Sequence, residues 1–120
     1  MIEFEVPVRL VSLLNAREHH MARARRAKTQ RTAAHTLARE HVSGLVDTPL
    51  SLTVTITRIA PGKLDDDNLT GSAKHVRDGI ADALGIDDGD PRITWVVEQA
   101  KFTGPHRGGY SCAVRIEVRE

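Results

Sequence analysis

The segment from Leu50 to Arg58 constrains the fold more than any other part of the sequence, because apolar and polar residues alternate along it without a break. Leucine, valine and isoleucine occupy every second position, with serine or threonine between them. Successive side chains of a strand point to opposite faces of a sheet, so this pattern predicts a strand with one buried and one solvated face. A sheet with one solvated face favours a mixed α/β fold over a doubly wound parallel sheet.

The rest of the chain predicts three further strands and two helices. Strands are expected at residues 2–8, 92–99 and 110–119, where apolar residues alternate with polar ones or form a short apolar run. Helices are expected at 16–42 and 68–84. We therefore expect a small mixed sheet with two helices, in the order β-α-β-α-β-β, of the α/β (α+β) class.

The second expected helix has an apolar stripe formed by Leu69, Ala73, Val76, Ile80 and Ala83. Spacings of three and four residues mark the side of a helix that packs on a core. Gly71 and Gly79 interrupt this helix, and each weakens it by roughly 1 kcal/mol relative to alanine. Close packing or a ligand is the expected reason for these glycines, and Gly85 is expected to end the helix.

The length and cysteine content of the chain bound its class. At 120 residues the chain can bury one core, so a single domain over 1–120 is expected. Cys112 is the only cysteine, which fits a reducing compartment, and it falls in a strand where a small buried side chain is expected. The sequence has neither an apolar run long enough to span a membrane nor a signal-peptide pattern at its start. We therefore expect a soluble, cytoplasmic protein that does not bind membranes.

Two groups of aspartates flank the second expected helix, one in the segment 63–69 and the other in 85–90. Asp65 and Asp67 are two residues apart, so in an extended segment their carboxylates would project to the same side. Crowded carboxylates repel one another unless a cation lies between them, and hard oxygen ligands suit Mg²⁺ or Mn²⁺. The pattern predicts a divalent-metal site. In the structural alternative, Asp67 or Asn68 caps the helix and the second group is a solvated turn.

Charge is distributed unevenly, although the formal net charge is only +1. Residues 17–41 contain seven basic and two acidic residues, whereas residues 63–92 contain eight aspartates and four basic residues. A basic segment beside an acidic pocket suits a polyanion that is held while a metal attacks it, although a basic helix face can also be merely solvated. The candidate contacts to a DNA backbone are Arg17, Arg23, Arg25, Arg26, Lys28 and Arg31.

Three features together carry a resemblance to a known family: the run Asp65-Asp66-Asp67-Asn68-Leu69, a lysine on the following helix, and the later pair Asp87-Asp88. With these features in this order of elements, the chain resembles the RusA-type Holliday-junction resolvases, which are common in phages and prophages. The resemblance implies metal-binding carboxylates at Asp65, Asp67 and Asp88, the motif asparagine at Asn68 and the helix lysine at Lys74. Arg77 is an alternative cation on that helix, and Asp66, Asp87 and Asp90 are close enough to substitute as ligands.

The activity implied by this resemblance is Mg²⁺-dependent hydrolysis of phosphodiester bonds in Holliday junctions or related branched DNA. Asp65, Asp67 and Asp88 would hold one or two Mg²⁺ ions, with Mn²⁺ as a substitute. Lys74 would stabilise charge on the phosphate or the leaving oxygen. Asn68 and the basic helix would contact DNA. Family members act as homodimers, which matches the symmetry of a four-way junction.

Two further functions are compatible with the same residues. The first is a non-catalytic DNA-binding or phage regulatory protein built on the same scaffold, whose aspartates are structural. The second is an adaptor that binds a basic partner through the acidic pocket. Intact Asp65, Asp67, Asn68 and Asp88 favour the nuclease over both.

Overall fold

A computed structural model describes residues 1–12, 20–42, 51–101 and 110–119 of the chain. The elements of these residues are β1 (Ile2–Val6), α1 (His20–Val42), β2 (Ser51–Ala60), α2 (Asp66–Ser72), α3 (Lys74–Leu84), β3 (Ile93–Lys101) and β4 (Ser111–Arg119). None of the described helices is both long enough and apolar enough to cross a membrane.

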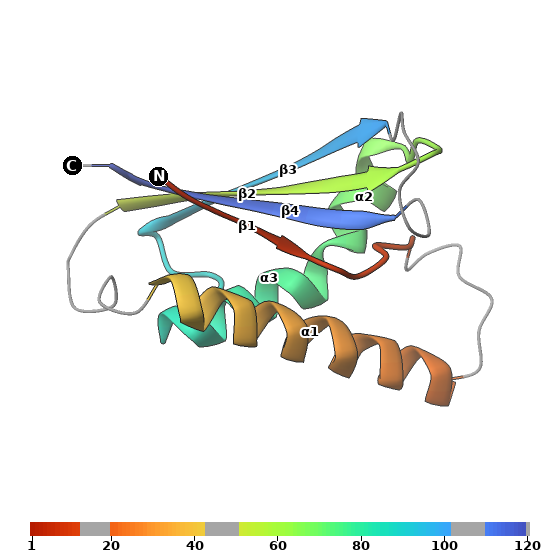
Figure 1. Ribbon diagram of the computed structural model, residues 1–120, viewed down its shortest axis with the longest axis horizontal. Coiled ribbons are helices and arrows are strands. Elements are labelled where there is room, and N and C mark those ends of the chain that lie inside the picture. Colours follow the sequence, from red (N-terminus) through yellow and green to blue (C-terminus); the bar gives the residue numbers. More distant parts are fainter. Residues whose placement is uncertain (13–19, 43–50, 102–109, 120) are drawn as a thin grey trace.

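The strands form one mixed sheet in the order β1-β4-β2-β3 (Figure 1). β4 runs antiparallel to both β1 and β2, whereas β3 runs parallel to β2. Val54 of β2 lies opposite Trp95 of β3 on one side and Ile116 of β4 on the other. The expected α+β class with a mixed sheet is confirmed.

One face of the sheet packs on the helices, and α1 and α3 lie on this side (Figure 1). The buried apolar face of β2 is confirmed, because Leu52, Val54 and Ile56 all lie in this core. The expected solvated face is wrong at Thr53 and Thr55, which are only 7% and 4% exposed. Cys112 on β4 is also fully buried, as expected, and burial raises the pKa of its thiol to about 12. The core is completed by Val6, Leu10, Ala34, Ala38, Val42, Ala73, Val76, Ile80, Leu84, Ile93, Val114 and Ile116.

The expected helix at 68–84 is broken at Ala73 into α2 and α3, so the expectation of two helices is wrong. The Ser72 hydroxyl donates a hydrogen bond of 2.6 Å to the Leu69 carbonyl oxygen. That carbonyl is the acceptor that the Ala73 N–H would use in a continuous α-helix. The Ala73 N–H bonds instead to the Thr70 oxygen at 3.3 Å, three residues back. The side chain of Ser72 thus competes with the backbone where α2 ends.

The expected end of the second helix at Gly85 is confirmed. Gly85 adopts the left-handed conformation with φ 71°, which glycine reaches without a steric penalty. Its N–H bonds to the Asp82 oxygen at 3.1 Å, and the Ile86 N–H bonds to the Ala81 oxygen at 3.2 Å. The two bonds satisfy carbonyls at the end of α3 and reverse the chain direction before the second acidic group.

Gly79 lies where α3 crosses α1. A Cβ at this position would lie 2.3 Å from the Arg31 carbonyl oxygen and 2.9 Å from the Ala34 Cβ. Beside this contact, Arg31 of α1 forms two hydrogen bonds to Asp82 of α3, at 2.7 and 3.0 Å. The expected close packing therefore holds for Gly79. It does not hold for Gly71, where a Cβ would meet nothing within 4 Å.

Replacing Gly79 with alanine should destabilise the protein, whereas the same change at Gly71 should not. The new Cβ at Gly79 would meet the backbone of α1, which cannot rotate away, so the free energy of unfolding should fall by about 1–3 kcal/mol. Alanine at Gly71 should leave this free energy unchanged or raise it by up to about 1 kcal/mol. Urea denaturation followed by circular dichroism measures both variants, and equal losses would contradict a close contact between α1 and α3.

Candidate functional site

Asp65 caps the start of α2. Its backbone is extended, and its Oδ1 accepts hydrogen bonds from the Asn68 N–H at 2.9 Å and from Asn68 Nδ2 at 2.8 Å. Helix α2 therefore begins at Asp66, and the expectation that Asp65 to Asp67 form an extended segment is wrong. A capping role is confirmed for this group, but Asp65 fills it instead of Asp67 or Asn68. Asp66 and Asp67 lie exposed in the first turn, where negative charge is favourable.

Asn68 is buried, with 8% of its surface exposed. Its Nδ2 donates to Asp65, and its Oδ1 accepts a short hydrogen bond from the Ser12 hydroxyl. The side chain thus ties the start of α2 to the segment that follows β1. In this conformation Asn68 positions Asp65 from inside the protein. Its expected contact with DNA stays a prediction.

The turn that leads into α2 is fixed by two polar side chains of the sheet. Gln99 of β3 accepts from the Leu64 N–H at 3.0 Å and donates to the Leu64 oxygen at 2.8 Å. The buried Arg58 of β2 donates to the Gly62 oxygen and to the Leu10 oxygen, both at 2.9 Å. Since polar groups in the interior are costly without partners, these contacts hold residues 61–64 in place. Sequence patterns do not reveal the contacts of Gln99 with Leu64 or of Arg58 with Leu10, because these partners are 35 and 48 residues apart in the chain.

Asp88 of the second acidic group lies beside Arg77 and Trp95. Its carboxylate Oδ2 is 3.4 Å from Arg77 Nε, an ion pair longer than a hydrogen bond. Its backbone oxygen accepts from Trp95 Nε1 at 2.8 Å and from Arg77 Nη2 at 3.2 Å. The Arg77 guanidinium lies 5.0 Å from the centre of the Trp95 ring. Of the two candidate cations on α3, Arg77 is the one that contacts Asp88, whereas Lys74 is exposed at the first position of the helix.

Asp90 is held by Arg92. The Arg92 backbone N–H and Nε donate to Oδ1 of Asp90 at 2.9 and 3.0 Å, and Nη2 donates to Oδ2 at 2.9 Å. These hydrogen bonds lower the pKa of Asp90 to about 2. Arg92 would compete with a metal ion for this carboxylate, which favours Asp88 over Asp90 as a ligand.

The two acidic groups lie at opposite ends of the strand pair β2–β3. The first follows Ala60, which pairs with Lys101, and the second precedes Ile93, which pairs with Leu52 (Figure 1). Among the described residues, no group of three or more histidine, cysteine, aspartate or glutamate side chains could hold a metal ion. The structure therefore brings Asp65 and Asp67 together at the start of α2, but does not gather Asp88 with them around one point.

The basic residues of α1 differ in their surroundings. The buried side of the helix consists of Gln30, Ala34, Ala38 and Val42. Arg23, Arg25 and Lys28 are exposed, and Arg26 is half-buried. Arg31 is paired with Asp82, and this hydrogen bond lowers the pKa of Asp82 below its ordinary value. Arg17 lies outside the described residues.

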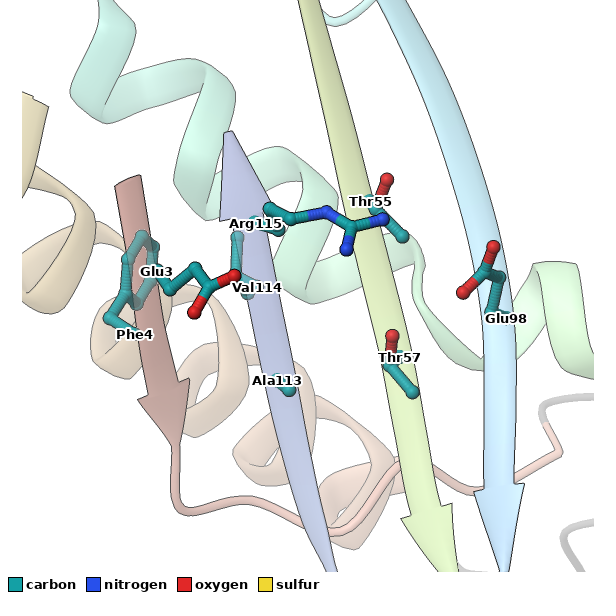
Figure 2. A pocket seen from close by; sticks show the side chains of 8 residues that line it. All are labelled: Glu3, Phe4, Thr55, Thr57, Glu98, Ala113, Val114 and Arg115. Atoms are coloured by element: carbon teal, nitrogen blue, oxygen red, sulfur yellow. The ribbon is translucent and has the colours of Figure 1, made fainter. Parts of the chain in front are cut away.

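Two hollows of about 390 Å³ each lie on the described surface. One is on the sheet face away from α1 and α3, where Figure 2 shows the Arg115 side chain reaching across Thr55 between Glu3 and Glu98. It touches neither acidic group. The other lies at the end of β2 and β3, beside the turn that precedes Asp65, and is lined by Pro61, Gly62, Lys63, Gln99, Ala100 and Lys101.

Comparison with known proteins finds a relative but does not define a family. No family model matches the chain, and no solved structure matches it. An uncharacterized protein of Xylella fastidiosa is 44% identical in an alignment of 81 residues that covers 62% of this chain. The chain spans about half the length of that relative, with 51% of it covered.

Replacing Arg92 with glutamine should raise the pKa of Asp90 from about 2 toward its ordinary value of 3.8. Because the folded-state pKa is the lower one, this pair contributes stability above about pH 4 and loses it as the pH falls toward about 2. An NMR titration of the side-chain carboxyl carbons measures the change, with Asp82 as the internal control because Arg31 is retained. An unchanged Asp90 titration would show that Arg92 does not hold this carboxylate.

Proposed function

We propose that the chain is a RusA-type, metal-dependent endonuclease that cuts Holliday junctions or related branched DNA in the cytoplasm. The observation that carries this proposal is the fixed geometry of the Asp65–Asn68 run. Its asparagine is buried and its first aspartate is locked as a cap, while Asp66 and Asp67 remain exposed at the surface. A helix cap alone requires one of these carboxylates, and the other two add only a favourable charge at the start of the helix.

The proposed ligands of Mg²⁺ or Mn²⁺ are Asp65, Asp67 and Asp88. Their hard oxygen donors fit these ions chemically. Both hydrogen bonds of Asp65 to Asn68 use Oδ1, so its second carboxylate oxygen can face a cation. Asp88 would have to leave Arg77 and approach α2 for the three to share one site. When bound, the metal supplies Lewis acidity and lowers the pKa of a bound water.

Basic side chains of the protein would hold and stabilise the DNA in this proposal. Lys74 is exposed where α3 begins, directly after the break at Ala73, and would stabilise negative charge on the phosphate or the leaving oxygen. Arg77 is the alternative for this role, but it would first have to part from Asp88. The exposed Arg25 and Lys28 of α1 would contact backbone phosphates, which gives binding by shape that weakens with salt.

The proposed assembly is a homodimer. A four-way junction presents two symmetry-related strands, and its resolution requires two nicks. Two copies related by a twofold axis would supply two active sites in matching positions.

A second candidate function is a DNA-binding protein without catalytic activity on the same scaffold. The separation of Asp88 from the start of α2 and its pairing with Arg77 favour it, because a structural ion pair is then the whole role of Asp88. The two candidates differ in one measurable outcome, which is Mg²⁺-dependent cleavage.

The protein should cleave a synthetic four-way junction only when Mg²⁺ or Mn²⁺ is present. Asp67→Asn should reduce cleavage by at least about 100-fold, since even outer partners of metal ligands typically contribute 10–100-fold. Junction binding should stay the same or become tighter, because a negative charge beside phosphate is removed. Gel assays of binding and cleavage measure both quantities.

Glu40→Gln is the matched control, because it removes an exposed carboxylate at the far end of α1. It should leave cleavage and binding unchanged. Binding by the unaltered protein without cleavage in either metal would select the non-catalytic candidate. Loss of both binding and cleavage in folded Asp67→Asn would contradict the assigned roles.

A further inference from the structure

The hollow at the end of β2 and β3 combines two lysines with a fixed backbone; we name it the lysine hollow. Lys63 lies in the turn after β2, and Lys101 ends β3, where it pairs with Ala60. The strand register therefore brings two residues that are distant in sequence to the same rim.

The backbone around the lysine hollow is held in place from both sides of Lys63. Arg58 bonds to the Gly62 oxygen at 2.9 Å, and Gln99 bonds to both backbone groups of Leu64. The positions of the Lys63 and Lys101 backbones relative to each other are thus set before any ligand arrives. A preformed site loses less conformational entropy on binding than a flexible one.

The two lysines differ from most other described cations near the acidic groups. Arg31, Arg77 and Arg92 each form an ion pair with an aspartate. Within the described residues, neither Lys63 nor Lys101 is in an ion pair, and both side chains are exposed. Their positive charges are therefore available to an anionic ligand at the rim of the lysine hollow.

We propose that the lysine hollow binds a backbone phosphate of a DNA strand, with the ammonium groups of Lys63 and Lys101 as its charged contacts. This inference rests on the proposed nuclease function and adds a subsite to it. Lysine binds phosphate as a point charge, and a volume of 390 Å³ admits a nucleotide unit with its phosphate. Because Asp65 follows Lys63 by two residues, a strand held here would lie near Asp65, one of the proposed metal ligands.

The other hollow, on the sheet face away from α1 and α3, does not favour a phosphate. Glu3 and Glu98 line it, and its one arginine, Arg115, lies 3.1 Å from Glu117. Negative charge at that rim would repel a phosphate. The lysine hollow is thus the better anion site of the two. It is also the hollow that lies next to the first acidic group.

The test compares the unaltered protein with Lys63→Gln/Lys101→Gln in binding to a short oligothymidylate, at several salt concentrations and without divalent metal. Each neutralised phosphate of a single strand contributes about 0.7 to the slope of log affinity against log salt, so losing the one phosphate held by both lysines should flatten the slope by about 0.7. Amide NMR shifts during the titration should be largest at Gly62, Lys63 and Lys101. Arg39→Gln removes an exposed positive charge at the far end of α1 and should leave slope and shifts unchanged.

An unchanged slope in the folded double variant, or shifts confined to α1, would overturn the proposed subsite. Different results would reject the nuclease proposal and the subsite proposal. Oligothymidylate binding at the lysine hollow without junction cleavage in Mg²⁺ would keep the subsite and reject the nuclease. Cleavage by the double variant with an unchanged KM would keep the nuclease and reject the subsite.

Discussion

The parallel pairing of β2 with β3 determines the layout of this protein. Parallel neighbours cannot be joined by a tight turn, so the chain must cross from the end of β2 back to the start of β3. Helices α2 and α3 make that crossing, and α1 packs against α3 at Gly79. The same constraint sends the two acidic groups to opposite ends of the strand pair. Any function that needs both groups must bring them together across the length of this crossing.

The buried Arg58 and Asn68 and the half-buried Gln99 fix the residues beside the first acidic group. Arg58, Gln99 and Asn68 each satisfy backbone or side-chain groups that would otherwise be unpaired away from water. Leaving such a group unpaired costs about 1–3 kcal/mol, so the turn before α2 has few alternative conformations. The exposed Asp67 and Lys63 are presented from this rigid base. A charged surface on a fixed backbone is well suited to binding a charged ligand without large rearrangement.

Local pattern predicted much of this architecture. The alternation in Leu50–Arg58 identified the central strand and its buried face, and Gly85 marked the end of α3. The break at Ala73 was not predicted, because it depends on the Ser72 hydroxyl taking one particular carbonyl. The alternation of apolar and polar residues also does not show which strands pair. The separation of the two acidic groups, which follows from the pairing of β2 with β3, could therefore not be predicted. Ser12, which donates to Asn68, lies 56 residues away in the chain, and a local pattern does not connect the two.

The central claim is that Asp67 and Asp88 act on one divalent ion although the described conformation holds them apart. Calorimetric titration with Mn²⁺ of the unaltered protein, Asp67→Asn and Asp88→Asn tests this claim most directly. The account predicts that each substitution weakens binding by at least about 10-fold, and that combining them adds little, because both remove ligands of the same site. Undiminished Mn²⁺ affinity in Asp88→Asn, or no binding by the unaltered protein, would contradict it.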